Sequence, residues 1–139
     1  MSAEVSVVPQ SGRDQPINPA VLKTLRALQR EGRPDVLSTL ITLFLDSARA
    51  LLTDLEKAAN GGEMAALWRA SHSLNLASAN IGATLLSARC KELEWMARAG
   101  PVLNPTARVA AIVTEFRRAE AALLAYLGKA TEAANGISA

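Results

Sequence analysis

Apolar residues recur every three or four positions along most of this chain, which is the spacing of residues on one face of an α-helix. In the longest stretch the apolar face runs from Leu37 through Phe44 and Leu55 to Ala58. Three similar stretches follow it, and a shorter one precedes it. The pattern predicts a short helix that begins at Pro19 and four long helices, over residues 34–58, 64–81, 86–97 and 105–127.

Glycine and proline residues separate these stretches. They lie at Gly32 and Pro34, at Gly61-Gly62, at Gly82 and at Gly100-Pro101. Glycine favours the left-handed turn after a helix and proline is tolerated at the start of the next, so we expect Pro34 to open the second helix and Gly82 to close the third. Short connections join antiparallel neighbours. The sequence therefore predicts an all-α fold, an antiparallel up-down-up-down four-helix bundle with the short N-terminal helix as a cap.

The 139 residues fit a single domain, because domains typically span about 100–200 residues. Residues 17–128 carry the helical pattern and make up the predicted bundle. Residues 1–16 are mostly polar, contain Pro9, Gly12 and Pro16, and show no sustained period, so we expect a flexible N-terminal arm. We expect residues 129–139 to form a flexible C-terminal tail.

The composition agrees with a helical fold and excludes several functions. Ala and Leu greatly outnumber Val and Ile, which argues against an all-β fold. The net charge is only +2, and the basic pair Arg117-Arg118 lies between Glu115 and Glu120, so we expect no nucleic-acid partner. The uncharged stretch 70–88 contains Ser, Asn and Thr residues, so we interpret it as a soluble helix and a turn and expect no membrane span.

Cysteine and histidine are scarce, with one residue of each. A single Cys90 allows no intramolecular disulfide, and the N-terminus lacks the pattern of a signal peptide, so we expect a cytoplasmic protein. Cys90 lies on the apolar face of its predicted helix and is interpreted as a core residue. Because a structural zinc site needs about four N or S ligands, we expect no metal site, and we expect no cofactor.

His72 is the residue best placed for chemistry. On its predicted helix it lies roughly 120° from the centre of the apolar face, so we expect its ring to be partly exposed. Its neighbours one turn away are Trp68, Arg69, Asn75 and Leu76. A surface histidine without a role is the simpler interpretation, but a purely solvated face would not need the apolar side chains of Trp68 and Leu76 beside it.

From His72 onward the chain reads His-Ser-Leu-Asn-Leu-Ala-Ser-Ala-Asn-Ile-Gly-Ala. This segment resembles the phosphoacceptor box of histidine-containing phosphotransfer (HPt) domains. The matching positions are His72, Leu74, Ala77, Ser78, Ile81, Gly82 and Ala83. The resemblance extends over about residues 17–128 and includes an Asn-Pro start at Asn18 and a Cys-x-x-Leu-Glu segment at Cys90.

The resemblance implies a phosphorelay carrier without autonomous catalysis. Nε2 of His72 would take a phosphoryl group from the aspartate of a response-regulator receiver domain, or of the receiver of a hybrid histidine kinase, and pass it to another receiver. The magnesium ion for this chemistry would belong to the receiver. Glu94 falls where the family often has a residue that orients the other imidazole nitrogen. Arg69, Lys91 and Arg98 are candidates to balance the charge of the phosphoryl group, and we expect a monomer.

Two positions depart from the family pattern. Asn75 stands where the family usually has a lysine thought to hold the phosphoryl group, and it can offer only an uncharged hydrogen bond. Leu76 replaces a small residue, and with Trp68 and Ala79 it is a candidate docking surface for a partner. We interpret Trp68 and Trp95 primarily as core residues, with an apolar docking surface around His72 as the alternative.

Other functions fit parts of this pattern. A phosphorylation-independent adaptor would keep the bundle and dock receiver or kinase domains through the face around Trp68 and Leu76. A histidine-kinase dimerisation hairpin also carries a histidine on a helical bundle, but it usually has an acidic residue at the position of Ser73 and a proline soon after, whereas none follows here before Pro101. A free-standing enzyme fits least, because no second catalytic group is assured near His72.

Overall fold

The computed structural model describes residues 15–29 and 35–138 of the chain, with side chains up to residue 128. These residues form five helices and no strand, which confirms the all-α prediction. The helices are α3 (Pro19–Arg26), α4 (Val36–Gly61), α5 (Met64–Ile81), α6 (Thr84–Ala99) and α7 (Pro105–Ser138). The expected flexible arm lies outside the described residues, except for its last two.

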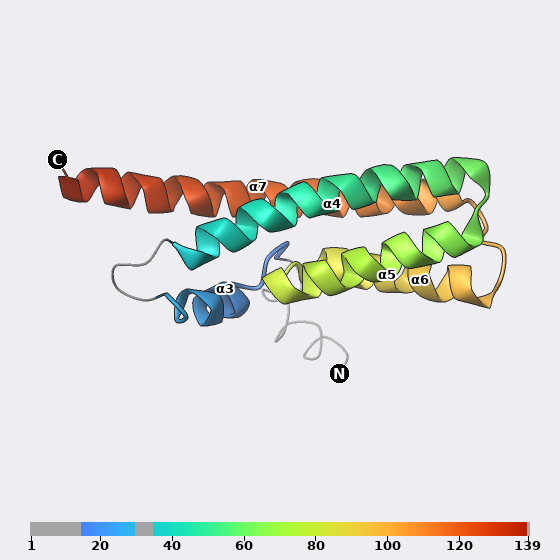
Figure 1. Cartoon of the computed structure of the whole chain (residues 1–139), viewed down its shortest axis with the longest axis horizontal. Helices are drawn as coiled ribbons and strands as arrows, with labels where there is room; N and C mark the ends of the chain where they lie inside the picture. Colours follow the sequence, from blue (N-terminus) through green and yellow to red (C-terminus); the bar gives the residue numbers. More distant parts are fainter. Residues whose placement is uncertain (1–14, 30–34, 139) are drawn as a thin grey trace, which may run out of the picture.

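The four long helices alternate in direction along the chain (Figure 1). Helix α5 packs against α4 on one side and α6 on the other, and α7 closes the bundle by contacting both α4 and α6. This arrangement is the predicted antiparallel up-down-up-down bundle. Short turns centred on Gly62 and Gly82, both in the left-handed region at φ 66° and 83°, join α5 to its two neighbours.

The predicted apolar faces meet in one core. Buried side chains come from all four long helices, and the rings of Phe44 on α4 and Phe116 on α7 lie 6.4 Å apart between centroids. Helix α4 is long and apolar enough to cross a membrane by length and composition, a property that core helices of soluble bundles share. Here it contributes nine buried residues to the bundle core: Leu37, Ile41, Phe44, Leu45, Ala48, Leu52, Leu55, Ala58 and Ala59.

The short helix α3 covers the end of the bundle where α5 turns into α6. The Asn18 side chain accepts a hydrogen bond from Ala20 N and so caps α3, while the backbone N–H of Asn18 donates to the carbonyl of Gly82 at 2.7 Å. A Cβ atom on Gly82 would lie 2.8 Å from Cβ of Val21, closer than real contacts allow. Glycine at position 82 therefore serves both the left-handed turn and the close approach of α3.

Several helix boundaries differ from the prediction. Helix α4 extends to Gly61 instead of residue 58, and α6 spans Thr84–Ala99 instead of 86–97. Helix α4 begins at Val36 rather than at Pro34, because the Asp35 carboxylate caps it by accepting hydrogen bonds from the backbone N–H and hydroxyl of Ser38. Helix α3 ends at Arg26, which leaves Leu28, expected on its apolar face, 59% exposed. Helix α7 continues to Ser138 through the expected tail, where alanine, lysine and glutamate favour the helix.

Candidate functional site

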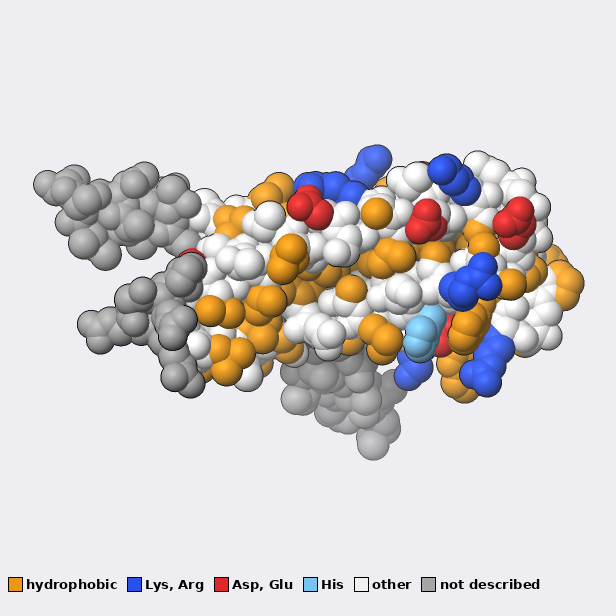
Figure 2. Space-filling view, viewed as in Figure 1, with side chains coloured by type: hydrophobic (Ala, Val, Ile, Leu, Met, Phe, Trp, Pro, Cys, Tyr) orange, Lys and Arg blue, Asp and Glu red, His pale blue; other side chains and the backbone are white. Residues whose placement is uncertain are grey.

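His72 lies midway along α5, on the side that faces α6. Its side chain is 43% exposed, as expected from its place on the flank of the apolar face. One turn earlier, the indole of Trp68 lies nearly parallel to the imidazole, with 10° between the ring planes and 5.6 Å between the centroids. Figure 2 shows the histidine at the surface with hydrophobic and basic side chains around it.

The imidazole is held from α6 by Glu94. Nδ1 of His72 lies 2.8 Å from Oε2 of Glu94, whose side chain is only 13% exposed. A carboxylate can only accept a hydrogen bond, so in the neutral imidazole Nδ1 carries the proton and Nε2 keeps its lone pair. Within the described part of the chain, Nε2 has no hydrogen-bond partner and is free to act as a nucleophile.

Asn75 extends this contact into a chain of hydrogen bonds between α5 and α6. Its side-chain nitrogen donates to Oε1 of Glu94 at 3.4 Å, and its side-chain oxygen accepts from the hydroxyl of Ser87 at 2.6 Å. Both carboxylate oxygens of Glu94 are therefore occupied, one by His72 and one by Asn75. The amide that stands in place of the family's lysine is turned towards α6.

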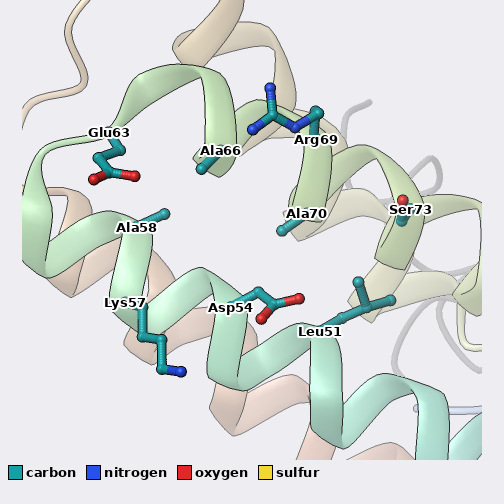
Figure 3. A pocket seen from close by; sticks show the side chains of 9 residues that line it. All are labelled: Leu51, Asp54, Lys57, Ala58, Glu63, Ala66, Arg69, Ala70 and Ser73. Carbon is teal, nitrogen blue, oxygen red and sulfur yellow. The ribbon is translucent and has the colours of Figure 1, made fainter.

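The three basic residues singled out in the sequence take no part in this network. Arg69, Lys91 and Arg98 are exposed, and no ion pair joins any of them to a carboxylate within the residues that the structure describes. Arg98 lines a small hollow with Glu94. Arg69 lies on the other flank of α5, at the rim of the groove towards α4 (Figure 3).

The apolar residues predicted near His72 differ in their exposure. Leu76 is 53% exposed and Ala79 is exposed on α5, while Trp68 is half-buried against the core. Trp95 is 70% exposed, so its interpretation as a core residue is wrong. The reason is its position: it lies outside the apolar face of α6 that contains Cys90 and Leu93.

Cys90 takes no part in the site. It is fully buried in the core, as its place on the apolar face of α6 predicted. Burial raises the pKa of the Cys90 thiol to about 12, and the negative charge of Glu94 adds to this effect. The thiol therefore stays protonated and unreactive in the folded protein.

Two hollows flank α5 on the side of α4. The first, of about 280 Å³, is an apolar groove where Leu25, Leu40, Leu43, Phe44, Ala77 and Ile81 gather. The second, of about 560 Å³, has a floor of Ala58, Ala66 and Ala70 and charged side chains at its rim (Figure 3). His72 lines neither of them. Among the described residues no group of three His, Cys, Asp or Glu side chains is placed to hold a metal ion.

Ser87 is a contact of this network that the sequence did not predict. A serine on a helix surface carries no signal by itself, and its contact with Asn75 depends on how α5 and α6 pack. One signal was available: Ser87 and Glu94 are seven residues apart, which places them on the same face of α6. The stacking of Trp68 on His72 was also missed, although the two residues were identified as neighbours.

Comparison with known proteins shows the family to which this chain belongs. A family model described as the Hpt domain matches residues 39–125. Among solved structures, the chain is similar to histidine-containing phosphotransfer protein B from Pseudomonas aeruginosa PAO1, with 27% sequence identity and a TM-score of 0.77. The match covers 84% of this chain and 97% of that one. A search of the curated proteins finds no match.

Proposed function

The chain belongs to the Hpt domain family, and on this basis we propose that it carries phosphoryl groups between receiver domains, with His72 as the acceptor. The family and the structural match support histidine phosphotransfer in a phosphorelay. The observation that carries the assignment of the residue is the hydrogen bond from Nδ1 of His72 to Glu94, which leaves Nε2 as the free nitrogen of a partly exposed ring.

The proposed step needs no proton transfer. Nε2 of His72 attacks the phosphorus of a receiver's aspartyl phosphate, a bond forms between Nε2 and phosphorus, and the bond from phosphorus to the aspartate oxygen breaks with its electron pair. The aspartate leaves as a carboxylate, and Nδ1 keeps its proton in the hydrogen bond to Glu94. Attack by a second receiver's aspartate on the phosphohistidine reverses these changes. Phosphoryl transfer depends mainly on positioning and electrostatics, which suits so sparse a site.

Charge balance on the phosphorylated protein falls to the basic residues around His72. A phosphoryl group adds nearly two negative charges, close to the carboxylate of Glu94. Arg69, Lys91 and Arg98 are exposed and unpaired with carboxylates in the described structure, which leaves them as the candidates for this role. We assign Asn75 a weaker part, because its amide is already bonded to Glu94 and Ser87.

Receiver domains are the partners of the family in general, and we propose that they dock beside His72. Exposed Leu76 and Ala79, half-buried Trp68 and the apolar groove near Leu43 offer the contact surface. Such docking does not itself require transfer, so an adaptor that binds receiver or kinase domains is the second candidate. Asn75 stands where the family has a lysine, and its amide is already bonded to Glu94 and Ser87, which favours the adaptor function. For either function we expect a cytoplasmic monomer.

The test is transfer of label from phosphorylated receiver domains to the wild-type chain and to His72→Ala. We expect an acid-labile, alkali-stable label on the wild type and none on His72→Ala. Because His72 lies outside the core, the two proteins should unfold at similar temperatures. Equal label on both proteins would contradict the choice of His72. Binding of a receiver without any transfer would support the adaptor instead.

A further inference from the structure

Trp68 is the one aromatic residue in contact with the imidazole of His72. The two residues are four positions apart on α5, so they lie on the same surface of the helix. Their rings are close to parallel and offset, with 10° between planes and 5.6 Å between centroids. This is a preferred arrangement for stacked rings. The other tryptophan, Trp95, is 70% exposed and makes no such contact.

The indole nitrogen of Trp68 makes no hydrogen bond that would hold the ring. Nε1 of Trp68 is buried and has no hydrogen-bond partner in the described structure. An unpartnered buried donor is unfavourable, and buried tryptophans usually find a partner for it. The ring therefore keeps its position through packing against the core and stacking on His72. Trp68 therefore contacts His72 through the face of its aromatic ring and not through its indole nitrogen.

The stack and the hydrogen bond restrain His72 in different ways. Glu94 fixes the imidazole at one edge, through Nδ1, and leaves the ring able to pivot about that contact. The indole covers one face of the ring and blocks a pivot towards that side. The two contacts together restrict the direction in which Nε2 points. Restricting a nucleophile to a productive direction is a large part of catalysis by positioning.

The stack also suits the charge that develops on the ring. When Nε2 bonds to phosphorus while Nδ1 keeps its proton, the imidazole becomes a cation. A cation over the face of an aromatic ring is stabilised, and tryptophan is the most effective of the aromatic side chains. The neutral ring gains less from the same contact. Trp68 thus favours the phosphorylated form and the transition state over the free histidine.

We propose that Trp68 is a positioning residue for phosphoryl transfer, whose indole orients the His72 imidazole and stabilises its cationic form through the stack. This inference rests on the proposed role of His72 as the acceptor. It assigns to Trp68 a task within this protein, separate from any contact with a docked partner.

The test compares Trp68→Leu, Trp68→Phe and Trp95→Phe with the wild type, using phosphoramidate as the phosphoryl donor. In this reaction Nε2 bonds to phosphorus as the phosphorus–nitrogen bond breaks and ammonia leaves, so no receiver is needed and docking plays no part. We expect the initial rate in Trp68→Leu to fall roughly two- to fivefold, the size of an exposed cation–aromatic interaction. Trp68→Phe should recover part of the rate, and Trp95→Phe should match the wild type.

Fluorescence provides a second readout that a purely structural role would not change. In the Trp95→Phe variant, Trp68 is the only tryptophan, so the emission comes from the residue that stacks on His72. We expect the emission to change when phosphoramidate phosphorylates His72. The same addition should leave the emission unchanged in Trp95→Phe combined with His72→Gln.

The outcomes separate the two proposals. If phosphoramidate labels the wild type but not His72→Gln, while Trp68→Leu reacts at the full rate, the role of Trp68 is wrong and that of His72 stands. An unchanged Trp68 emission on phosphorylation would also overturn the proposed role of Trp68. If no label reaches His72 from phosphoramidate or from any receiver, the proposed function fails first. Unfolding temperatures of all variants show whether a lower rate reflects a loss of folded protein.

Discussion

Helix α5 has a different relation to each of its two neighbours. Towards α6, hydrogen bonds connect His72, Glu94, Asn75 and Ser87. Towards α4, an open groove of about 560 Å³ has a floor of alanines (Figure 3). Among the described residues, no ion pair joins the charged side chains at its rim. The site proposed for phosphoryl transfer thus lies where partners hold side chains in fixed positions, and not in the larger hollow.

The two turns that join α5 to these neighbours also differ in what surrounds them. Gly62, between α4 and α5, and Gly82, between α5 and α6, both adopt positive φ and follow the same turn pattern. Nothing lies within 4 Å of a Cβ built on Gly62. At Gly82 such an atom would meet Val21 at 2.8 Å and the carbonyl oxygen of Asn18 at 3.2 Å. Gly62 and Gly82 therefore have the same backbone conformation, but only Gly82 lies against another helix.

The largest effect is expected from replacing these glycines by alanine. Gly62→Ala should cost about 1–2 kcal/mol of unfolding free energy, from the left-handed backbone alone. Gly82→Ala should cost about 2–5 kcal/mol, because the clash with α3 adds to the same strain. Urea unfolding of both variants measures the difference. Equal costs would show that the contact between α3 and the α5–α6 turn contributes nothing to stability.

The next effect concerns the hydrogen bonds between α5 and α6. Glu94→Ala removes the acceptor that fixes His72 and leaves Asn75 without its partner, so transfer to His72 should slow roughly ten- to hundredfold, the worth of a hydrogen bond to a charged group. Glu94→Gln keeps an acceptor oxygen and should lose less. The matched control is Asp54→Ala, which removes a carboxylate from the rim of the groove towards α4. Similar initial rates of transfer for Glu94→Ala and Asp54→Ala would show that the α6 side of α5 matters no more for transfer than the α4 side.

The smallest effect concerns how α4 and α5 begin. Hydrogen bonds from the hydroxyl and backbone N–H of Ser38 lower the pKa of the Asp35 carboxyl, whereas Glu63 at the start of α5 makes no side-chain cap bond. Because the folded pKa lies below the unfolded value, this stabilisation is present above about pH 4 and is lost as the pH falls through the folded pKa. Asp35→Ala should therefore cost about 1 kcal/mol at neutral pH and progressively less in acid.

Thermal unfolding of Asp35→Ala and Glu63→Ala across this pH range is the measurement. We expect the gap between wild type and Asp35→Ala to narrow in acid and Glu63→Ala to show no such change. A gap for Asp35→Ala that is independent of pH would show that its carboxylate is not the capping group.

Much of this protein could be predicted from its residue pattern, because the pattern reflects local physics. The period of apolar residues indicated the helices, and the glycines and short connections indicated their antiparallel order. His72 was found through its flank position and through the residues that follow it. Trp95 was misplaced because a large apolar residue was assumed to be buried, although it lies off the apolar face of α6.

The sequence alone determined the helices, the bundle and the single candidate nucleophile, since each depends on residues a few positions apart. The tertiary structure decided which partners His72 has. Glu94, which the family resemblance indicated, bonds to His72, and Ser87, which no pattern indicated, bonds to Asn75. Both come from a neighbouring helix, and the geometry of their contacts depends on the rotation of α6 against α5. The same packing turned Asn75 towards α6 and brought α3 onto Gly82. Contacts between helices depend on side-chain packing across the whole bundle, and the site proposed for this protein is built from such contacts.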